Sequence, residues 1–396
     1  MDNTVIDYDK VLSQRIKNIK PSGIRKYFDI AESMEGVISL GVGEPDFKTP
    51  WVARREAVRV LEKGKTTYTA NAGLMTLREE CAKYFRRTIG VNYDPASEVV
   101  ITVGGSEGID LTIRSMISDG DEVLIVEPCF VCYDPIVSLC GGVPVAIETK
   151  AEDDFRLTAE ELREKITERT KLLVLPYPNN PTGAIMKKED LEEIAKVLRG
   201  TDIMVLSDEI YSELTYSGEH VSISSLEGMR ERTVVINGFS KAFAMTGWRL
   251  GIAAGPKEVI SQMLKLHQYA IMSSPTVSQY AAITALRECG DDVRKMREEY
   301  DMRRRYIVDA FNKLGLSCFT PMGAFYVFPC IKSTGLTSGE FCEKLVYSKK
   351  VAVVPGSAFG KCGEGFIRVS YAYSLSHLME AVKRIGEFLK ELDNDR

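Results

Sequence analysis

Short runs of Val, Ile and Leu, bounded by Gly, Pro and Asp, recur from about residue 98 to residue 254. These runs are EVVITV, DEVLIV, VPVAI, KLLVLP, DIMVLSD, TVVING and LGIAAG. Between several of them the apolar residues recur at spacings of three and four, as in LTAEELREKI and KKEDLEEIAKVL, which is the period of an amphipathic helix. Continuous apolar strands that alternate with helices are typical of a largely parallel sheet covered on both faces. The pattern therefore predicts one large α/β domain.

The pattern changes from about residue 286 onward. It predicts a long charged helix at roughly 291–314, then short alternating strands (AFYVF, VAVVP and FIRVSY) and a final amphipathic helix from about residue 375. This texture is typical of a smaller α+β domain. The first twenty residues are polar and show no strong period, so we expect an arm that rests on the body of the protein or on a neighbouring subunit.

Composition and charge exclude several classes of protein. The chain has 396 residues, and 51 Lys and Arg against 56 Asp and Glu give a formal net charge of −5. Without a long basic block it has no electrostatic footprint for nucleic acid or for an anionic membrane. No apolar run approaches the roughly 18 residues of a membrane span, and the amino terminus is acidic where a signal peptide would be basic. We expect a cytoplasmic protein that binds neither nucleic acid nor membrane.

Cysteine and histidine give little support for a metal centre. The nine cysteines, an odd number, are scattered as expected for reduced thiols. Cys129 and Cys132 form a CxxC pair, but no second pair follows, and His220, His267 and His377 lack the spacing of metal ligands. We therefore expect no metal, and we keep a redox or zinc role for the CxxC pair as a minor alternative.

A glycine-rich turn joins the first of these strands to a helix. The segment GGSEG at 104–108 follows EVVITV and precedes the helical IDLTIRSMI. Backbone N–H groups of such a turn can close around an anion at the helix N-terminus, and Ser106 adds a hydroxyl donor. The same residues spell GxSxG, the nucleophile elbow of a hydrolase, and His377 could complete the required order. Anion binding, a serine hydrolase acting through Ser106 and a turn chosen only for packing all remain open from this motif.

Two polar segments follow strands at the edge where an open α/β sheet binds its ligands. The segment PNNPTG, residues 178–183, comes after KLLVLP, and SDEIY, residues 207–211, closes the strand DIMVL. A carboxylate directly after a buried strand costs free energy unless a cation meets it, so Asp208 needs a positive partner. The alternative is that Asp208 or Glu209 merely caps a helix.

A lysine and an arginine follow the strand TVVING. Lys241 has apolar neighbours that disfavour its charged form, so its amine could be nucleophilic near neutral pH. Arg249, eight residues further on, could hold an anion at the same edge. A lysine that extends to solvent is the ordinary alternative for Lys241, and only its neighbourhood argues against it.

Taken together, NPTG at 180–183, SDEIY at 207–211 and Ser240-Lys241 with Arg249 resemble the signature of class I/II aminotransferases. These are pyridoxal-phosphate enzymes of fold type I, and the chain resembles their aspartate/aromatic aminotransferase branch. The similarity runs nearly end to end. It includes SLGVGEPDF at 39–47, YTANAGLMTLRE at 68–79, GAFYVFP at 323–329, and VAVVPGSAFG with GEGFIRVSYA at 351–372.

The resemblance implies how the chain is divided. We expect an N-terminal arm at residues 1–20 and a large pyridoxal-phosphate-binding domain at residues 50–285 with a mostly parallel seven-stranded sheet. A small domain would be assembled from both ends of the chain, from residues 21–49 and 286–396.

The resemblance also assigns roles around the cofactor ring. Lys241 would carry the cofactor and move the proton at the substrate Cα, and Asp208 would pair with the N–H of the pyridine ring. Asn180 and Tyr211 would hydrogen-bond the phenolate oxygen of the ring. Phe130, in PCFVCY, would stack on the ring.

The phosphate of the cofactor would be held by the glycine-rich turn. The implied set is Gly105, Ser106, Glu107, Ser240 and Arg249, which replaces the hydrolase interpretation of the turn. In addition, Tyr68 matches a tyrosine that reaches the phosphate of the adjacent subunit, so the resemblance implies a homodimer with shared active sites. Many relatives have a serine where this chain has Gly238, so one phosphate hydroxyl is missing.

The resemblance places the substrate between the two domains. Arg368 would bind the α-carboxylate in a bidentate manner, with Gly43 and Asn180 beside it, so substrate binding is expected to close the domains. Near PSGIRKY at 21–27, Ile24 offers no polar group and Ser22 offers a hydroxyl, so an aromatic or apolar amino acid is at least as plausible as aspartate.

The predicted activity is a ping-pong aminotransferase that passes the amino group of an L-amino acid to a 2-oxo acid such as 2-oxoglutarate. A C–S β-lyase on the same scaffold is the nearest alternative, and a serine hydrolase using Ser106 is a remote one. A non-catalytic regulator would need a DNA-binding module, for which the N-terminal arm leaves no room.

Overall fold

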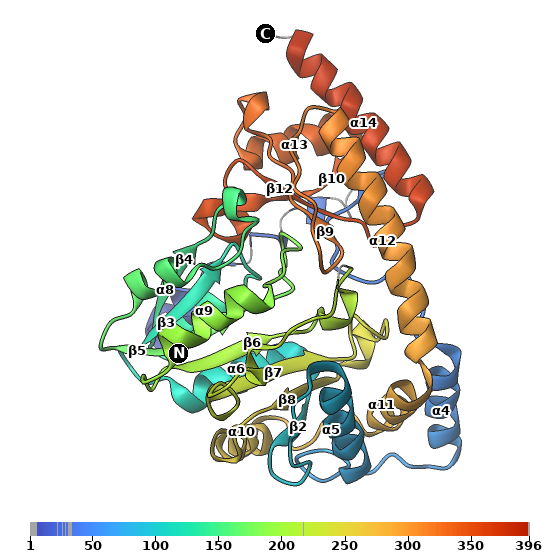
Figure 1. Ribbon diagram of the computed structural model, residues 1–396. Coiled ribbons are helices and arrows are strands. Elements are labelled where there is room, and N and C mark those ends of the chain that lie inside the picture. The colour runs from blue at the N-terminus through green and yellow to red at the C-terminus, as the bar shows by residue number, and fades with distance from the viewer. Residues whose placement is uncertain are drawn as a thin grey trace, which may run out of the picture.

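A seven-stranded sheet forms the centre of the protein in this computed structural model, which describes residues 6–21, 23–25, 27, 29–30, 34–216 and 218–394 (Figure 1). Every one of the seven apolar runs noted above forms a strand of this sheet, in the order β2-β8-β7-β6-β5-β3-β4. The strands are β2 (Val99–Thr102), β3 (Glu122–Glu127), β4 (Val143–Glu148), β5 (Thr170–Leu175), β6 (Met204–Asp208), β7 (Thr233–Gly238) and β8 (Gly251–Ala254).

The sheet is mostly parallel, as predicted. Strands β3, β4, β5, β6 and β7 run parallel to their neighbours in that group, whereas β8 is antiparallel to both β2 and β7. The carboxyl ends of the parallel strands therefore lie along one edge of the sheet. This edge carries Asp208 at the end of β6, and the turns after β5 and β7 begin there.

Helices cover both faces of the sheet. Side chains alternate between the two faces along each strand, so a continuous apolar run makes both faces apolar and both must be covered. Leu172 and Val174 of β5 pack with α6 (Gly104–Met116), α7 (Tyr133–Leu139) and α10 (Lys257–Ala270). Leu173 and Leu175 pack on the opposite face with α8 (Ala159–Lys165) and α9 (Lys188–Leu198). The rest of that face is covered near β2 and β8 by α5 (Met75–Ile89) and α11 (Thr276–Glu288), and α4 (Trp51–Glu62) packs on α11.

The carboxyl-terminal part stands beside this layered body and is connected to it by α12 (Gly290–Lys313), the long orange helix of Figure 1. It contains the antiparallel strands β11 (Val354–Pro355), β12 (Ile367–Ser370) and β9 (Tyr326–Val327). Helices α13 (Ser338–Lys349) and α14 (Leu375–Asn394) pack together there.

The amino-terminal region returns to this carboxyl-terminal part. Strand β1 (Ile38–Ser39) pairs in parallel with β10 (Val351–Ala352), and the backbone of Leu40 accepts a hydrogen bond from Ser370. Two segments about 300 residues apart in sequence therefore share one structural unit, which is what a small domain built from both chain ends requires. The predicted domain boundaries themselves remain predictions.

The predicted arm forms two short helices in its described part, α1 (Tyr8–Val11) and α2 (Gln14–Lys17), and residues 1–5 lie outside the described ranges. Arg15 ties the arm to the body, since its Nη2 lies 2.8 Å from Oδ1 of Asp119. Within the described ranges no helix is both long enough and apolar enough to cross a membrane.

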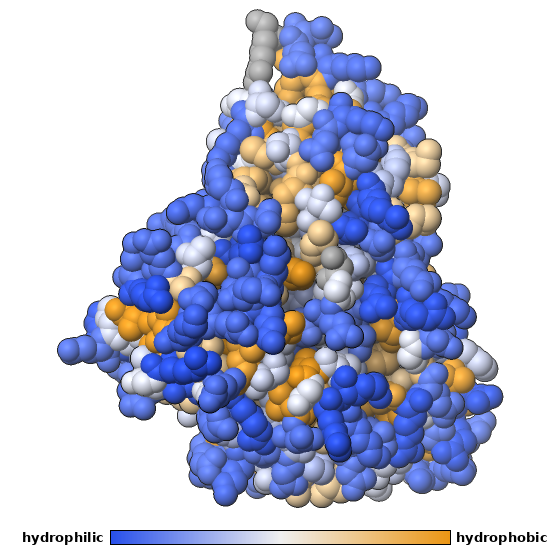
Figure 2. Space-filling view, viewed as in Figure 1, coloured by the Kyte–Doolittle hydropathy of each residue, from blue (hydrophilic) through white to orange (hydrophobic). Residues whose placement is uncertain are grey.

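The face shown in Figure 2 is mostly hydrophilic, with apolar residues exposed in separate patches. Cytoplasmic localisation remains a prediction from the sequence.

Candidate active site

A cavity of about 540 Å³ opens at the carboxyl edge of the central sheet, where strands β9 and β12 of the carboxyl-terminal part face it. Most of the residues predicted from the sequence line this one cavity. They are Gly43, Gly105, Ser106, Phe130, Asn180, Asp208, Tyr211, Ser240, Lys241, Arg249 and Arg368. Two predicted residues, Glu107 and Tyr68, are not among the lining residues.

Lys241 lies within the cavity, just beyond the end of β7. Its Nζ donates a hydrogen bond to the backbone carbonyl of Gly43 at 2.6 Å. The pKa of Lys241 is lowered to about 8, chiefly by burial; the positive charges of Arg368 and Arg249 act in the same direction, and the negative charges of Glu44 and Asp208 oppose them. About a tenth of this amine is therefore uncharged at pH 7, far more than for an ordinary lysine, and the uncharged form is the one that can act as a base or nucleophile.

Asp208 ends β6 as a buried carboxylate with two hydrogen-bond donors. Oδ2 accepts from the phenol of Tyr133 on α7 at 2.7 Å, and Oδ1 accepts from the backbone N–H of Ile210 at 3.2 Å. Burial raises the pKa of Asp208, and the hydrogen bond from Tyr133 opposes that effect. A cationic N–H group placed in the cavity would stabilise the ionised carboxylate.

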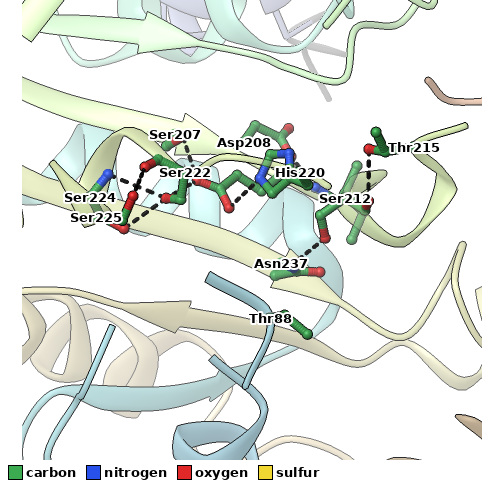
Figure 3. Close-up of polar contacts among 12 residues, drawn as sticks. Thr88, Ser207, Asp208, Ser212, Thr215, His220, Ser222, Ser224, Ser225 and Asn237 are labelled. Atoms are coloured by element: carbon green, nitrogen blue, oxygen red, sulfur yellow. Dashed lines mark hydrogen bonds and ion pairs between the residues drawn. The ribbon is translucent and has the colours of Figure 1, made fainter. Parts of the chain in front are cut away.

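The neighbouring Glu209 belongs to a separate buried network, and Figure 3 labels its partners Ser207, His220 and Ser222. Its carboxylate is 1% exposed. Oε1 accepts hydrogen bonds from Ser207 at 2.8 Å and from Ser222 at 2.5 Å, and Oε2 lies 2.8 Å from Nε2 of His220. These hydrogen bonds connect the end of β6 to the segment at 220–225. They restrain the backbone at Glu209 and therefore the position of the adjacent Asp208.

Neither acid at the end of β6 caps an α-helix. The chain continues instead into a short 3₁₀ turn, Ser212–Leu214, whose N-cap is Tyr211. The helix-cap alternative for Asp208 and Glu209 is therefore wrong.

Groups that could bind an anion lie together where α6 begins. Gly104 is the first residue of α6, and a Cβ at that position would lie 2.5 Å from Nη2 of Arg249. The guanidinium of Arg249 thus packs directly against the turn, and Gly105, Ser106 and Ser240 line the cavity beside it. Free N–H groups and the positive end of a helix, together with an arginine, favour a phosphate at this position.

Gly238 occupies a position where a side chain has no room. A Cβ there would lie 3.0 Å from Cδ1 of Ile210, 3.0 Å from the carbonyl oxygen of Leu250 and 3.1 Å from Cα of Gly251. The missing hydroxyl noted from the sequence therefore follows from close packing between β7, β8 and the residues after β6.

Arg368 extends from β12 into the cavity and is buried. Its Nη1 donates to Oδ1 of Asn180 at 2.8 Å and its Nη2 to the carbonyl oxygen of Gly41 at 2.5 Å. The guanidinium also lies 4.6 Å from the centroid of the Tyr326 ring. Within the described part of the chain its Nε has no hydrogen-bond partner, so a buried donor is left for a ligand carboxylate.

Two tyrosines of the site were not predicted from the sequence. Tyr326 shares a hydrogen bond with Tyr211 at 2.8 Å between the phenol oxygens, and Tyr133 donates to Asp208. Tyr326 lies in the segment GAFYVFP and Tyr133 in PCFVCY. Their presence in these segments was the only feature of the sequence that could have indicated a role in the site. Tyr326 also packs closely on Gly43, where a Cβ would lie 2.2 Å from its phenol oxygen.

Ile24 and Glu44 also line the cavity. Ser22, the possible polar group considered from the sequence, lies outside the described residues. Tyr68 is 81% exposed and lies away from the cavity of its own subunit.

The histidines do not support a serine hydrolase. His220 contacts Glu209, His267 contacts Glu107, and His377 is hydrogen-bonded to Ser374. Each histidine is therefore paired with a residue other than Ser106. None of the three is among the residues that line the cavity with Ser106.

The cysteines do not suggest redox or metal chemistry. All nine are free thiols, and burial raises the pKa of both Cys129 and Cys132, which disfavours the reactive thiolate. Among the residues that the structure describes, no cluster of three or more His, Cys, Asp or Glu side chains could hold a metal ion.

Comparisons with known proteins agree with this geometry. The family described as aminotransferase class I and II matches residues 35–385. The chain is 47% identical to the aromatic-amino-acid aminotransferase 2 of Thermococcus litoralis and 47% identical to the aspartate aminotransferase of Pyrococcus abyssi, in each case over 96% of this chain and 98% of the relative. The crystal structure of the aspartate aminotransferase of Thermus thermophilus with maleate superposes with a TM-score of 0.91 at 39% identity, covering 95% of this chain and 99% of that one.

These matches cover nearly the whole chain, so the matched region includes both the central sheet and nearly all residues that line the cavity. They confirm the predicted fold type I, with its mostly parallel seven-stranded sheet. The chain therefore belongs to the aminotransferase class I and II family, close to the aspartate and aromatic aminotransferases, and is itself an aminotransferase.

Proposed function

We propose that this aminotransferase uses pyridoxal phosphate and prefers an aromatic or apolar L-amino acid as donor, with a 2-oxo acid such as 2-oxoglutarate as acceptor. The observation that carries the proposal is the arrangement of charge in the cavity. Among its described lining residues the cations are Lys241, Arg249 and Arg368. Each of the three contacts different residues of the cavity.

The cavity residues fit pyridoxal phosphate. Arg249 and the N-terminus of α6 form an anion site that suits its phosphate, and Asp208 is a buried carboxylate that suits a protonated ring nitrogen. Lys241 offers an amine that is partly uncharged at neutral pH. Phe130, Asn180 and Tyr211 line the space between these groups, as expected for contacts with the ring and its phenolate oxygen. We therefore propose the cofactor roles that the resemblance implied for them.

When bound, pyridoxal phosphate supplies a carbonyl carbon that takes up the amino group and a protonated ring that accepts electrons from the substrate. The residues supply the rest. Lys241 would accept a proton from the substrate Cα and return it, which its lowered pKa permits near neutral pH. Asp208 would keep the ring nitrogen protonated, and Tyr133 and the network of Glu209 would hold Asp208 in position.

Arg368 would bind the α-carboxylate of the substrate. Its unpartnered Nε and its ordered Nη groups present the planar fork that suits a carboxylate, and Asn180 and Gly41 fix its orientation. Since Arg368 comes from β12 and Lys241 from the end of β7, a bound amino acid would join the two proposed domains. We propose that substrate binding draws these domains together.

The donor preference follows from the remaining charges. With Arg249 assigned to phosphate and Arg368 to the α-carboxylate, no further cation of the same subunit lines the described part of the cavity to meet a second substrate carboxylate. Glu44 and Ile24 lie there instead, and a carboxylate or an isoleucine disfavours an acidic side chain. This argument supports an aromatic or apolar donor over aspartate.

We further propose a homodimer with shared active sites. Several exposed apolar side chains gather on two segments that are hydrogen-bonded together, since Asn71 Nδ2 donates to the carbonyl of Met272 and Thr276 Oγ1 to that of Thr67. This subunit face consists of the exposed side chains Tyr68, Met75, Tyr269, Ile271 and Met272. Exposed apolar groups that gather in this way mark an interaction surface, and Tyr68 would extend from it toward the partner's phosphate site.

The test is a kinetic survey of the protein loaded with pyridoxal phosphate. We expect kcat/KM with 2-oxoglutarate to be at least about tenfold higher for L-phenylalanine or L-tyrosine than for L-aspartate. A higher value for aspartate would contradict the donor preference alone. Release of pyruvate and ammonia from a cysteine conjugate, without any amino acceptor and in place of transfer, would instead favour the β-lyase alternative.

A further inference from the structure

A Glu–His pair, formed by the partly buried Glu107 and the buried His267, lies at the turn that begins α6. Glu107 stands in the first turn of this helix but is not among the residues that line the cavity. Its Oε2 accepts a hydrogen bond from the backbone N–H of Val103 at 2.5 Å, and its Oε1 lies 2.8 Å from Nδ1 of His267 on α10. The carboxylate thus connects the end of β2, through the turn at Gly104, to a helix that the proposed mechanism does not use.

His267 is fully buried, and only one of its ring nitrogens has a partner. Because a carboxylate accepts hydrogen bonds, Nδ1 carries a proton in this pair. In the part of the chain that the structure describes, Nε2 has no hydrogen-bond partner. An apolar side chain would fill this position without leaving a buried polar atom unpaired, so the contact from Nδ1 to Glu107 is the feature that distinguishes histidine here.

The position of Glu107 makes that contact important for an anion. A carboxylate within the first turn of α6 would repel a phosphate bound at the same helix end if its side chain turned toward the cavity. The hydrogen bonds from Val103 and His267 hold the charge on the interior side of the turn. They also fix the backbone at Val103 and Gly104, just before Gly105 and Ser106, which line the cavity where the phosphate is proposed to bind.

We propose that His267 is a positioning residue for phosphate recognition, which holds the Glu107 carboxylate away from the anion site and braces the turn that binds the phosphate. The proposal rests on the proposed use of pyridoxal phosphate. His267 touches neither the cofactor nor the substrate and acts through Glu107.

The side chain can be replaced without breaking the main-chain contacts of His267. Its carbonyl oxygen ends α10 by accepting hydrogen bonds from the N–H groups of Ile271 at 2.8 Å and Met272 at 3.0 Å. His267→Leu removes only the donor to Glu107, and His267→Met is a second apolar variant in case the first does not fold. His267→Asn restores a donor near the position of Nδ1. The matched control is His377→Leu on α14, where the histidine is exposed and far from the anion site.

The experiment compares two probes that differ only in the phosphate. The dissociation constants of pyridoxal 5′-phosphate and of pyridoxal are measured for each apo protein by absorbance titration. We expect His267→Leu and His267→Met to weaken binding of pyridoxal phosphate by about 10- to 100-fold, the effect of losing a hydrogen bond to a charged group. Binding of pyridoxal should change less than about threefold, while His267→Asn should recover most of the loss and His377→Leu should match the wild type.

Two outcomes would overturn the proposal. Either apolar variant could keep the full preference for pyridoxal phosphate over pyridoxal, or both probes could weaken equally, as a general loss of stability would cause. A wild-type protein that binds neither probe, or binds both equally, would instead contradict the proposed cofactor, so the two failures can be told apart.

Discussion

At the scale of single residues, the cations of the cavity differ in how their charges are met. Arg249 packs on the turn before α6, Arg368 keeps an unpartnered Nε, and Lys241 is a desolvated amine. The chain's net charge of −5 gives no sign of this local positive region. The chemistry of each group therefore follows from its burial and its immediate partners.

Burial of Lys241 should make the stability of the apo protein depend on pH in a defined window. Its pKa is about 8 in the folded protein against an ordinary 10.5, so between these values the unfolded chain binds a proton that the folded chain has released. The desolvated amine therefore costs no stability above pH 10.5, and its cost grows as the pH falls from 10.5 to 8 and is complete below 8. Replacing it by methionine removes a cost that is largest below pH 8.

We expect Lys241→Met to stabilise the apo protein at pH 7 by about 1–3 kcal/mol, and this gain should disappear toward pH 10.5. Urea unfolding of both proteins over a series of pH values measures the difference. A gain that stays constant across the series would show that the amine is not desolvated in the folded protein.

Arg368 should contribute to substrate binding through the geometry of its fork as well as its charge. Arg368→Lys keeps the charge but cannot donate to one carboxylate through two parallel hydrogen bonds, so KM for the amino acid should rise by about 10- to 100-fold. Affinity for pyridoxal phosphate should be unchanged. Arg305→Lys, at an exposed position of α12, is the matched control for steady-state kinetics. An unchanged KM would place the substrate carboxylate elsewhere.

The residues of the site were predictable where a motif carried them. Lys241, Asp208 and Arg368 stand in recognisable segments and line one cavity. Tyr133 and Tyr326 were missed because their roles depend on partners that lie 75 and 115 residues away in sequence, namely Asp208 and Tyr211. Such pairs arise from the packing of α7 and β9 against the sheet edge, which residue types alone do not reveal.

At the scale of elements, apolar runs predicted every strand of the central sheet, because a strand buried on both faces has a continuous apolar sequence. The direction of β8 was not predictable in the same way, since the run LGIAAG contains no information on which way the strand enters the sheet. Strands β1, β10 and β11 are two residues long, and their pairing depends on tertiary packing.

The contact between β7 and β8 explains the glycine at 238 and yields a prediction. A serine at this position would supply the additional hydroxyl that many relatives have. Its Cβ, however, would lie too close to Ile210 and to the backbone of β8. We expect Gly238→Ser to lower the free energy of unfolding by about 1–3 kcal/mol without tightening cofactor binding. Adding Ile210→Val, which removes the Cδ1 atom in contact, should recover part of the loss.

Thermal unfolding and cofactor titration of the single and double variants test that prediction. If Gly238→Ser binds pyridoxal phosphate more tightly and is as stable as the wild type, close packing does not explain the glycine.

At the scale of the whole molecule, the shared-site homodimer can be tested by mixing two differently impaired subunits. Lys241→Ala removes the proposed catalytic amine, and Tyr68→Ala removes the proposed contact with the partner's phosphate. In a mixed dimer the site that retains Lys241 receives Tyr68 from the other subunit, so one complete site forms. We expect the mixture to regain up to about half of the wild-type activity per mixed dimer, and cofactor affinity at that site to recover.

Mixed dimers are prepared by unfolding and refolding the two variants together. The controls are each variant measured alone and Lys241→Ala carried alone through the same unfolding and refolding. Activity of the mixture that only equals the average of the two variants would argue against sharing. Sedimentation of the wild type as a monomer at micromolar concentration would contradict the dimer itself.

Amino-group transfer at Lys241 is tested most directly by a two-step absorbance titration of the protein loaded with pyridoxal phosphate. We predict that L-phenylalanine alone shifts the absorbance of the bound cofactor and releases about one phenylpyruvate per site, as a ping-pong half-reaction requires. Addition of 2-oxoglutarate should then restore the original spectrum and yield glutamate, and Lys241→Ala should fail at the first step. A spectrum that does not respond to any amino acid, or a Lys241→Ala protein that transfers the amino group as fast as the wild type, would contradict the proposed function.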